Sequence, residues 1–461
     1  MSKTYSDHIS SIYKFANSEY KVEGNTLSFN SINLPELIKK EGSPLKVFYL
    51  PKISTNISKC NEWFKHAIKN ASYKGKHHYS YCTKSNHFLP VIERALSSGA
   101  HLEISSSFDF KIIDELIKRN KVDPSTFILC NGFKTPSYID SICKKINQGY
   151  TNTLPIIDNI KEIELLSKGI SKNINIGLRL STEESSNHSL NTSRFGIAEK
   201  EFTHFNKQLQ KHKNMRFVML HFFINSGITD TSYYWNALEK KISFYCKLKP
   251  LCPDLKYINI GGGLKTHSAL NDNSSHKKII EKIVSLISSV CQKNKTDPPD
   301  IFTEFGNYTV SNCACTLYSV IGKKQQENDL KCLMINSSFI TSLPDIWAID
   351  KGFQVLAINN LDIAFEEIYL GGLSCDGDDF YDSNKNNGSI YMPVIEKARD
   401  LHIGFFNTGA YQEALGGFGG LQHCLIPSPK YIFADMNKNK DVVYRVFKKE
   451  QDADQILSLI T

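Results

Sequence analysis

The chain has 461 residues, of which 41% are hydrophobic, 11% aromatic and 22% charged. This length allows two domains with a large buried core, and the composition excludes a disordered or fibrous protein. A formal net charge of +8 is small for this size, and the lysines are spread along the chain, so no nucleic-acid partner is expected.

No stretch is long and apolar enough to span a membrane, and the polar start of the chain lacks the apolar core of a signal peptide. The twelve cysteines are scattered and include no Cys-x-x-Cys pair, which argues against a disulfide framework and against a metal site. We therefore expect a cytoplasmic protein with no metal and no membrane partner.

Residues 45–310 alternate short apolar runs with amphipathic segments of helical period. Several of the runs are continuously apolar, as buried parallel strands are. Strand–helix units repeated in this way predict an α/β fold of the (β/α)8 or TIM-barrel type. The predicted strands are His78–Thr83, His101–Ser105, Phe127–Cys130, Leu154–Ile157, Ile174–Leu180, Phe217–Ile224, Tyr257–Ile260 and Ile301–Glu304.

After residue 310 the pattern changes to short strands separated by polar turns. Residues 311–461, completed by residues 1–44, are expected to form a second, mostly β domain of sandwich or barrel type. The basic run Lys438–Lys449 alternates with apolar residues and predicts a hairpin with an exposed basic face. The predicted strands are Leu330–Asn336, Glu367–Leu370, Ile403–Phe406, Tyr431–Phe433 and Val442–Phe447.

Two features at the carboxyl ends of predicted barrel strands carry chemistry. Gly261-Gly262-Gly263 follows the seventh strand, where barrels often bind phosphate, and successive glycines let backbone N–H groups surround an anion. Taken alone, the triplet fits a plain tight turn about as well. Lys84 follows the first strand, and although a lone lysine is usually a solvated charge, a desolvated one can attack an aldehyde.

Lys84 and the glycine triplet, in this order on this scaffold, resemble the fold type III enzymes that use pyridoxal 5′-phosphate (PLP), which have an alanine-racemase-like barrel. The closer resemblance is to the decarboxylase branch, which acts on ornithine, arginine and diaminopimelate. It extends from about residue 45 to the end of the chain. The resemblance implies PLP as the cofactor, held by Lys84 as a Schiff base.

Other segments match motifs of this family in the same order. By the resemblance, His221 stacks on the cofactor ring and Glu304 pairs with the ring nitrogen. A carboxylate there keeps the nitrogen protonated, so that the ring accepts the electrons left by CO2 loss, and Glu304 therefore favours decarboxylation over racemisation. The residues expected to bind the cofactor are Lys84, Glu103, Arg179, His221, Ser226, Gly261, Gly262, Gly263, Glu304, Gly306, Asn307 and Tyr411.

The segment from Gly372 to Asp379 resembles the Gly-Pro-Thr-Cys-Asp-x-x-Asp motif of the family. The resemblance makes Cys375 the acid that protonates Cα, so that Lys84, His221, Glu304 and Cys375 form the expected catalytic set. In the family this cysteine and the aspartate after it come from the neighbouring subunit, which implies a homodimer with shared active sites. Without the resemblance, Cys375 would be one more buried thiol and the aspartates an ordinary acidic turn.

Both the phosphate end and the substrate end of the site depart from the family. Asn307 replaces an arginine of the phosphate cup, Asn259 replaces an aspartate, and neither standard specificity determinant is present. The phosphate grip is therefore expected to be weaker or to use other donors. The expected substrate contacts are Asp376, Asp379, Asp345 and Phe339, and the aromatic ring would equally fit a larger or less charged side chain.

The hypothesis is PLP-dependent α-decarboxylation of a small amino-acid substrate, polar or basic by preference, as in polyamine biosynthesis. One alternative is another PLP reaction on the same scaffold, either racemisation or oxidative decarboxylation–deamination. A second is a degenerate, non-catalytic regulatory homologue, which the departures at Asn307 and Asn259 would explain. Retention of Lys84, Glu304 and Cys375 argues against the second alternative.

Overall fold

The computed structural model describes residues 3–13, 19–182, 193–266, 274–325, 330–386, 388–394, 401–415, 423–458 and 460–461. The chain divides into two compact units. Ser54–Lys265 and Ser274–Thr309 form the barrel unit, and Met1–Ile53 and Val310–Thr461 form the β unit.

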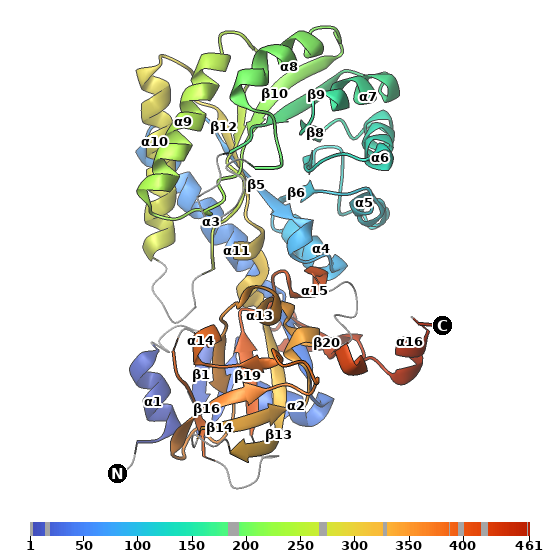
Figure 1. The fold of residues 1–461 in the computed structure, drawn as a ribbon. Coiled ribbons are helices and arrows are strands. Elements are labelled where there is room, and N and C mark those ends of the chain that lie inside the picture. The colour runs from blue at the N-terminus through green and yellow to red at the C-terminus, as the bar shows by residue number, and fades with distance from the viewer. Residues whose placement is uncertain are drawn as a thin grey trace. The chain divides into compact units, whose positions relative to one another are not determined.

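The barrel unit is built on eight parallel strands that close on themselves (Figure 1). The pairing of the last strand with the first, with Glu304 beside Ser80, completes the ring. The predicted (β/α)8 barrel is thus confirmed. Its strands are β5 (His77–Cys82), β6 (His101–Ile104), β7 (Ile128–Cys130), β8 (Thr153–Ile157), β9 (Ile174–Arg179), β10 (Met215–His221), β11 (Tyr257–Asn259) and β12 (Asp300–Glu304).

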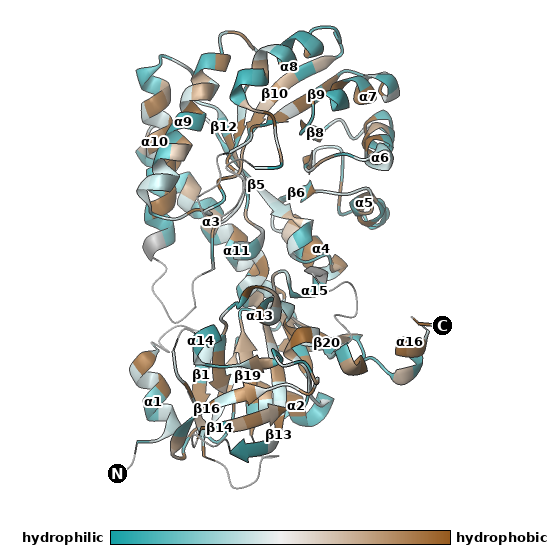
Figure 2. Cartoon of the chain, viewed as in Figure 1, coloured by the Kyte–Doolittle hydropathy of each residue, from teal (hydrophilic) through white to brown (hydrophobic). Residues whose placement is uncertain are grey.

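Helices between the strands cover the outside of the barrel (Figure 1). Their amphipathic sequences explain this arrangement: in the helix after β5, Val91, Ile92 and Ala95 share one buried face. Figure 2 shows hydrophobic and hydrophilic residues on each of these helices. They are α3 (Pro51–Asn70), which precedes β5, and α4 (Leu89–Ser97), α5 (Asp109–Lys118), α6 (Pro136–Asn147), α7 (Lys161–Gly169), α8 (Phe202–Leu209), α9 (Ser232–Leu248) and α10 (Ser274–Lys293). The short helix α11 (Gly306–Val310) follows β12.

Apolar side chains fill the interior of the barrel. Leu129, Leu154, Ile156 and Phe302 belong to one buried cluster, and the ring of His78 stacks on Phe302 with centroids 4.4 Å apart. Because the interior is packed, a ligand can enter only at a rim, and the carboxyl ends of parallel strands are where barrels place their active sites.

The β unit is organised around the long strand β13 (Ala314–Gln325). One part of β13 pairs with β4 (Leu45–Tyr49) and β19 (His402–Phe406), and the other part pairs with β14 (Lys331–Ile335). The other strands are β1 (Tyr20–Glu23), β2 (Thr26–Phe29), β3 (Ile32–Asn33), β15 (Gln354–Ala357), β16 (Phe365–Gly371), β17 (Phe380–Tyr381), β18 (Ile390–Pro393), β20 (Lys430–Met436) and β21 (Val442–Lys448).

Short helices connect these strands. No helix of the described residues, in either unit, has the length and apolar character needed to cross a membrane. The helices of the β unit are α1 (Tyr5–Ile12), α2 (Leu34–Glu41), α12 (Phe339–Ser342), α13 (Pro344–Ile349), α14 (Ser383–Asn386), α15 (Gln412–Leu415) and α16 (Ala453–Leu457).

The boundary between the units differs from the predicted one. The barrel domain was expected to begin at residue 45, but the strand that starts there, β4, pairs with β13 and β20 of the β unit. The apolar sequence of β4 resembles that of a buried barrel strand, and only the strands with which it pairs distinguish β4 from a barrel strand. The barrel unit therefore begins at Ser54.

Candidate active site

Lys84 lies at the carboxyl end of β5, in the short 3-10 turn Thr83–Ser85. Its Nζ is 2.5 Å from Oε2 of Glu103 on β6; the lysine side chain is 42% exposed and the glutamate side chain 1%. Desolvation opposes the charge of the lysine, but Cys82, Glu103 and Glu304 outweigh it and raise the pKa of Lys84. The free lysine is therefore a cation. It can attack an aldehyde only after its ion pair with Glu103 breaks.

Asn131, directly after β7, connects the two carboxylates of the site. Its Nδ2 donates to Oε1 of Glu103 at 3.1 Å and to Oε1 of Glu304 at 2.9 Å. An amide nitrogen carries two hydrogens, so both bonds can form at once. We did not predict Asn131 from the sequence, although its position after a barrel strand was an available signal.

Glu304 lies at the end of β12 and is held from a second side. Nδ2 of Asn259, at the end of β11, donates to the same Oε1 of Glu304 at 2.7 Å. Asn259 thus replaces the expected aspartate with a hydrogen-bond donor. Two amide donors fix the orientation of this buried carboxylate.

His221 lies at the end of β10, next to Glu304. Its Nδ1 is 3.3 Å from the carbonyl oxygen of Asn259 and 4.0 Å from Oε1 of Glu304. Burial, and then the nearby Arg179, lower the pKa of His221 to about 3. The imidazole is therefore neutral near pH 7, and Nδ1–H donates to the carbonyl.

Arg179, at the end of β9, lies over an aromatic ring. Its Cζ is 4.8 Å from the ring centroid of Phe195. This contact orients the guanidinium at the rim, and its charge contributes to keeping His221 neutral.

The glycine triplet follows β11 and packs tightly on its neighbours. Gly261 and Gly263 have φ values of +71° and +99°, which favour glycine. A Cβ at Gly262 would lie 2.5 Å from the carbonyl oxygen of Glu304, and one at Gly263 would lie 2.6 Å from Cα of Gly227. The loops after β10 and β11 and the end of β12 therefore meet at backbone level, where a side chain would not fit.

Three other predicted residues line the same rim. Ser226, in the loop after β10, donates from Oγ to the carbonyl oxygen of Gly227 at 3.0 Å. Gly306 begins α11 and packs against Ser85, so that any Cβ there would collide with the serine hydroxyl. Asn307 follows and is half-buried. The structure thus brings all the predicted cofactor contacts of the barrel unit to the carboxyl ends of its strands.

In the β unit, Cys375 and Asp376 lie in the loop between β16 and β17, and Cys375 is exposed. Asp379 closes this loop: its carboxylate accepts hydrogen bonds from the N–H groups of Phe339 at 2.8 Å and Ser374 at 2.9 Å. Asp379 is buried, so these two bonds account for its carboxylate oxygens. The residue shapes the loop that carries Cys375.

The other predicted residues of the β unit are more enclosed. Phe339 is fully buried, with its ring among those of Tyr318 and Phe405, as part of the core. The Asp345 carboxylate is buried and accepts from Nζ of Lys351 and Nε2 of Gln412, each at 2.8 Å. Tyr411 is half-buried, with a φ of +69°.

Comparison with known proteins places this geometry in a family. Residues 56–311 match the family model described as pyridoxal-dependent decarboxylase, pyridoxal binding domain. The chain belongs to this family. The resemblance described from the sequence is confirmed, as are PLP as the cofactor and the class of PLP-dependent amino-acid decarboxylases, which are carboxy-lyases.

Relatives and solved structures agree with the family. A biosynthetic arginine decarboxylase of Prochlorococcus marinus strain MIT 9215 is 24% identical over 98% of this chain and 86% of its own length. The structure of the biosynthetic arginine decarboxylase SpeA from Campylobacter jejuni aligns with a TM-score of 0.80 and 20% identity, covering 99% of this chain and 90% of that one. A diaminopimelate decarboxylase of M. jannaschii in complex with L-lysine aligns with a TM-score of 0.79 and 17% identity, covering 96% of this chain and 98% of that one. The solved structures support the fold.

The barrel rim has the groups that a pyridoxal-dependent decarboxylase needs for its cofactor. The backbone N–H groups at the glycine triplet suit a phosphate. Lys84 supplies an amine, His221 a neutral imidazole and Glu304 a carboxylate held by two amide donors. Oδ1 of Asn131 is buried and has no hydrogen-bond partner among the described residues. A polar group bound at the rim would satisfy this oxygen. The residues present therefore fit PLP.

Proposed function

We propose that the chain catalyses α-decarboxylation of a polar or basic amino acid, with Lys84 holding PLP as a Schiff base. The observation that carries the proposal is the network of Lys84, Glu103, Asn131 and Glu304 at the barrel rim. PLP, when bound, supplies a ring that accepts the electron pair left by CO2 loss. Residues of the chain perform the other functions.

Glu304 and His221 have complementary roles at the cofactor ring. The two amide donors hold Glu304 so that its carboxylate can keep a proton on the ring nitrogen. His221 presents a neutral imidazole for stacking, which adds no positive charge beside the ring. The glycine triplet, Ser226 and Asn307 would hold the phosphate, in the absence of the family arginine.

Cys375 is the proposed proton donor to Cα. Its hydrogen bond with Cys424 raises the pKa of Cys375, so the thiol stays protonated, as an acid catalyst must. Asp376, the next residue, is the proposed contact for a distal amine or guanidinium of the substrate. The arginine decarboxylases among the relatives make arginine the first substrate to test.

We further propose a homodimer in which Cys375 of the partner subunit completes each site. Support comes from the edge strand β21, where Val443, Tyr444, Val446 and Phe447 are each between 36% and 44% exposed. A cluster of large apolar side chains on a sheet edge is typical of a surface covered by a partner. A second copy of the chain would cover it with an equivalent edge.

We also propose a cytoplasmic location. All twelve cysteines are free thiols, and ten of them are buried. Unpaired cysteines in this number suit a reducing compartment better than an oxidising one.

The test is a screen of amino acids, starting with arginine, ornithine, lysine and diaminopimelate, for CO2 release by the purified holoenzyme. Cys375→Ala should lower kcat by about 100-fold or more, whereas Cys252→Ala, a buried cysteine of the barrel unit, should not. A racemised product with its carboxylate intact would contradict decarboxylation. A protein that binds no PLP and turns over no amino acid would favour the regulatory alternative.

A further inference from the structure

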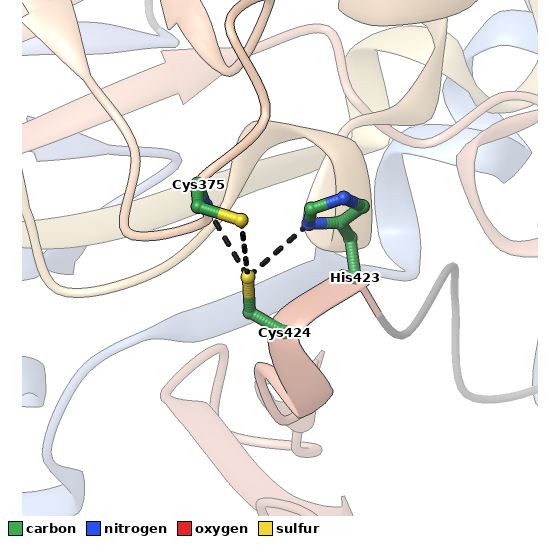
Figure 3. Close-up of side chains that lie close together, drawn as sticks. All are labelled: Cys375, His423 and Cys424. Carbon is green, nitrogen blue, oxygen red and sulfur yellow. Dashed lines mark hydrogen bonds between the residues drawn. The ribbon is translucent and has the colours of Figure 1, made fainter.

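Three side chains that commonly bind metal ions converge in the β unit (Figure 3). Sγ of Cys375 lies 3.3 Å from Sγ of Cys424, which in turn lies 3.3 Å from Nδ1 of His423. One ligand atom from each residue lies within 4.8 Å of the other two. Cys375 and Cys424 are also the two exposed cysteines of the chain, so both thiols are open to an ion from solvent.

We propose that Cys375, Cys424 and His423 bind one Zn²⁺ ion. Two thiolates and an imidazole are a donor set that zinc prefers. Two sulfurs at about 2.3 Å from a tetrahedral zinc lie about 3.8 Å apart. The observed separation of 3.3 Å needs to open by about half an ångström, which small χ1 rotations of exposed side chains allow. Because the site is exposed, water takes the fourth position.

Asp376 lies near the other nitrogen of the imidazole. Its Oδ2 lies 3.9 Å from Nε2 of His423, while Nδ1 of the same ring faces the sulfur of Cys424. A carboxylate at the nitrogen that does not bind metal is the usual arrangement behind a zinc-bound histidine, where it orients the ring. His423 thus has one nitrogen for the ion and one for Asp376.

The backbone at Cys424 has an uncommon conformation, which accompanies the clustering of the three side chains. Cys424 and Leu425 have φ values of +54° and +51°, a left-handed conformation that is uncommon for residues other than glycine. Figure 3 shows the side chains of His423 and Cys424, although consecutive in the chain, both directed towards Cys375. Strained backbone of this kind is typical of functional sites.

Zinc would control the proposed reaction. Both thiols lose their protons to solvent when they bind the ion. A zinc-bound Cys375 has no proton to give to Cα, so bound zinc should stop turnover reversibly. This consequence rests on the proposed role of Cys375, whereas the metal site itself does not.

The experiment is a titration of the full-length holoenzyme with Zn²⁺ by isothermal calorimetry, in a phosphine reductant that prevents a Cys375–Cys424 disulfide. Co²⁺ serves as a second probe, because thiolate ligands give it a charge-transfer absorption. We expect one ion per chain, at least about tenfold weaker binding in Cys424→Ser and in His423→Gln, and unchanged binding in His204→Gln. His204 is an exposed histidine of α8 and serves as the control.

A wild-type protein that binds no zinc, or a Cys424→Ser variant that binds it as tightly, would overturn the proposal. In the activity arm, zinc should stop CO2 release by the wild type and a chelator should restore it, whereas Cys424→Ser should lose a smaller fraction of its own zinc-free rate at the same zinc concentration. Turnover that continues with zinc bound would overturn the inhibitory role. Because the titration needs no turnover, zinc binding by a protein that releases no CO2 would support the site and contradict only the proposed function.

Discussion

At the scale of single residues, Asn131 determines how the two acidic groups of the site are arranged. One amide nitrogen donates to both Glu103 and Glu304. Without it, the two buried carboxylates would lack a shared donor. The residue therefore positions the groups that we propose to act on the cofactor.

Replacing Asn131 by Ala should destabilise the fold by about 1–3 kcal/mol, because buried acceptors lose their donor. The catalytic rate should fall as well. Urea unfolding and CO2 release measure the two effects. Asn147→Ala, which removes an exposed amide that bonds the carbonyl oxygen of Gly169, is the control and should change both little. An Asn131→Ala variant that matches this control would contradict the positioning role.

The pH dependence of stability tests the environment of His221. Burial and Arg179 lower its pKa to about 3 in the folded chain, against about 6.5 in an unfolded one. Above about pH 6.5 neither state binds the proton. As the pH falls below that value, only the unfolded state gains it, so stability is lost at up to about 1.4 kcal/mol per pH unit.

His221→Phe removes this contribution. The free energy of unfolding of the variant should therefore fall less steeply than that of the wild type between about pH 6.5 and about pH 4.5. Urea denaturation at constant ionic strength gives both slopes. His204→Gln, at an exposed position, should keep the wild-type slope. Equal slopes for wild type and His221→Phe would contradict a buried, neutral imidazole.

Some residues could be placed from the sequence and others could not. Lys84 follows a predicted strand, and His221 and Glu304 lie in the second half of predicted strands. Parallel strands of a barrel all end at one rim, so the convergence of these residues follows from the topology. Asp379 belongs to a segment that matches a family motif, whereas Phe339 lies in a segment that departs from the family. Whether a side chain there turns to the core or to a ligand depends on long-range packing, and the structure shows both buried.

At the scale of elements, the edge strand β21 is the clearest unpaired feature. It pairs with β20 on one side only, and apolar side chains are exposed along it. The sequence predicted a hairpin with a basic exposed face here. The structure adds that Val443, Val446 and Phe447 are exposed beside the lysines, which a single solvated face would not explain.

If β21 forms the dimer contact, Val446→Lys combined with Phe447→Lys should weaken self-association by about tenfold or more. Sedimentation velocity over a range of concentrations measures the effect. Leu457→Lys, at an exposed residue of α16, is the control and should leave self-association unchanged. A double variant that remains as dimeric as the wild type would place the interface elsewhere.

Element prediction succeeded where neighbours in the chain are neighbours in space. Each barrel strand pairs with those before and after it, so a repeating pattern of strands and helices was sufficient. In the β unit, β4 pairs with strands that lie more than 250 residues further along the chain. No local pattern contains that information, and the boundary was accordingly placed too early.

At the scale of the whole molecule, a homodimer with shared sites makes a distinctive prediction. Lys84→Ala and Cys375→Ala should each be nearly inactive alone, because each removes one component of every site. In an equimolar mixture, half of the dimers pair one subunit of each kind and regain one intact site out of two. Activity should therefore recover to about a quarter of the wild-type value.

Mixing two preparations of the same variant is the control and should restore nothing. Activity is followed as CO2 release after the subunits have exchanged. If the mixture of the two variants stays inactive although exchange has occurred, each site must be built from a single chain. In that case the role of Cys375 of the partner subunit would be wrong.

The central claim is that Lys84 holds PLP, and chemical trapping tests it most directly. Borohydride reduction of the holoenzyme makes the bond between the lysine and the cofactor permanent, and peptide mass spectrometry then locates it. We predict the pyridoxyl group on Lys84 and its loss in Lys84→Ala. Finding it instead on another lysine, such as the buried Lys134 that pairs with Glu162, would contradict the account.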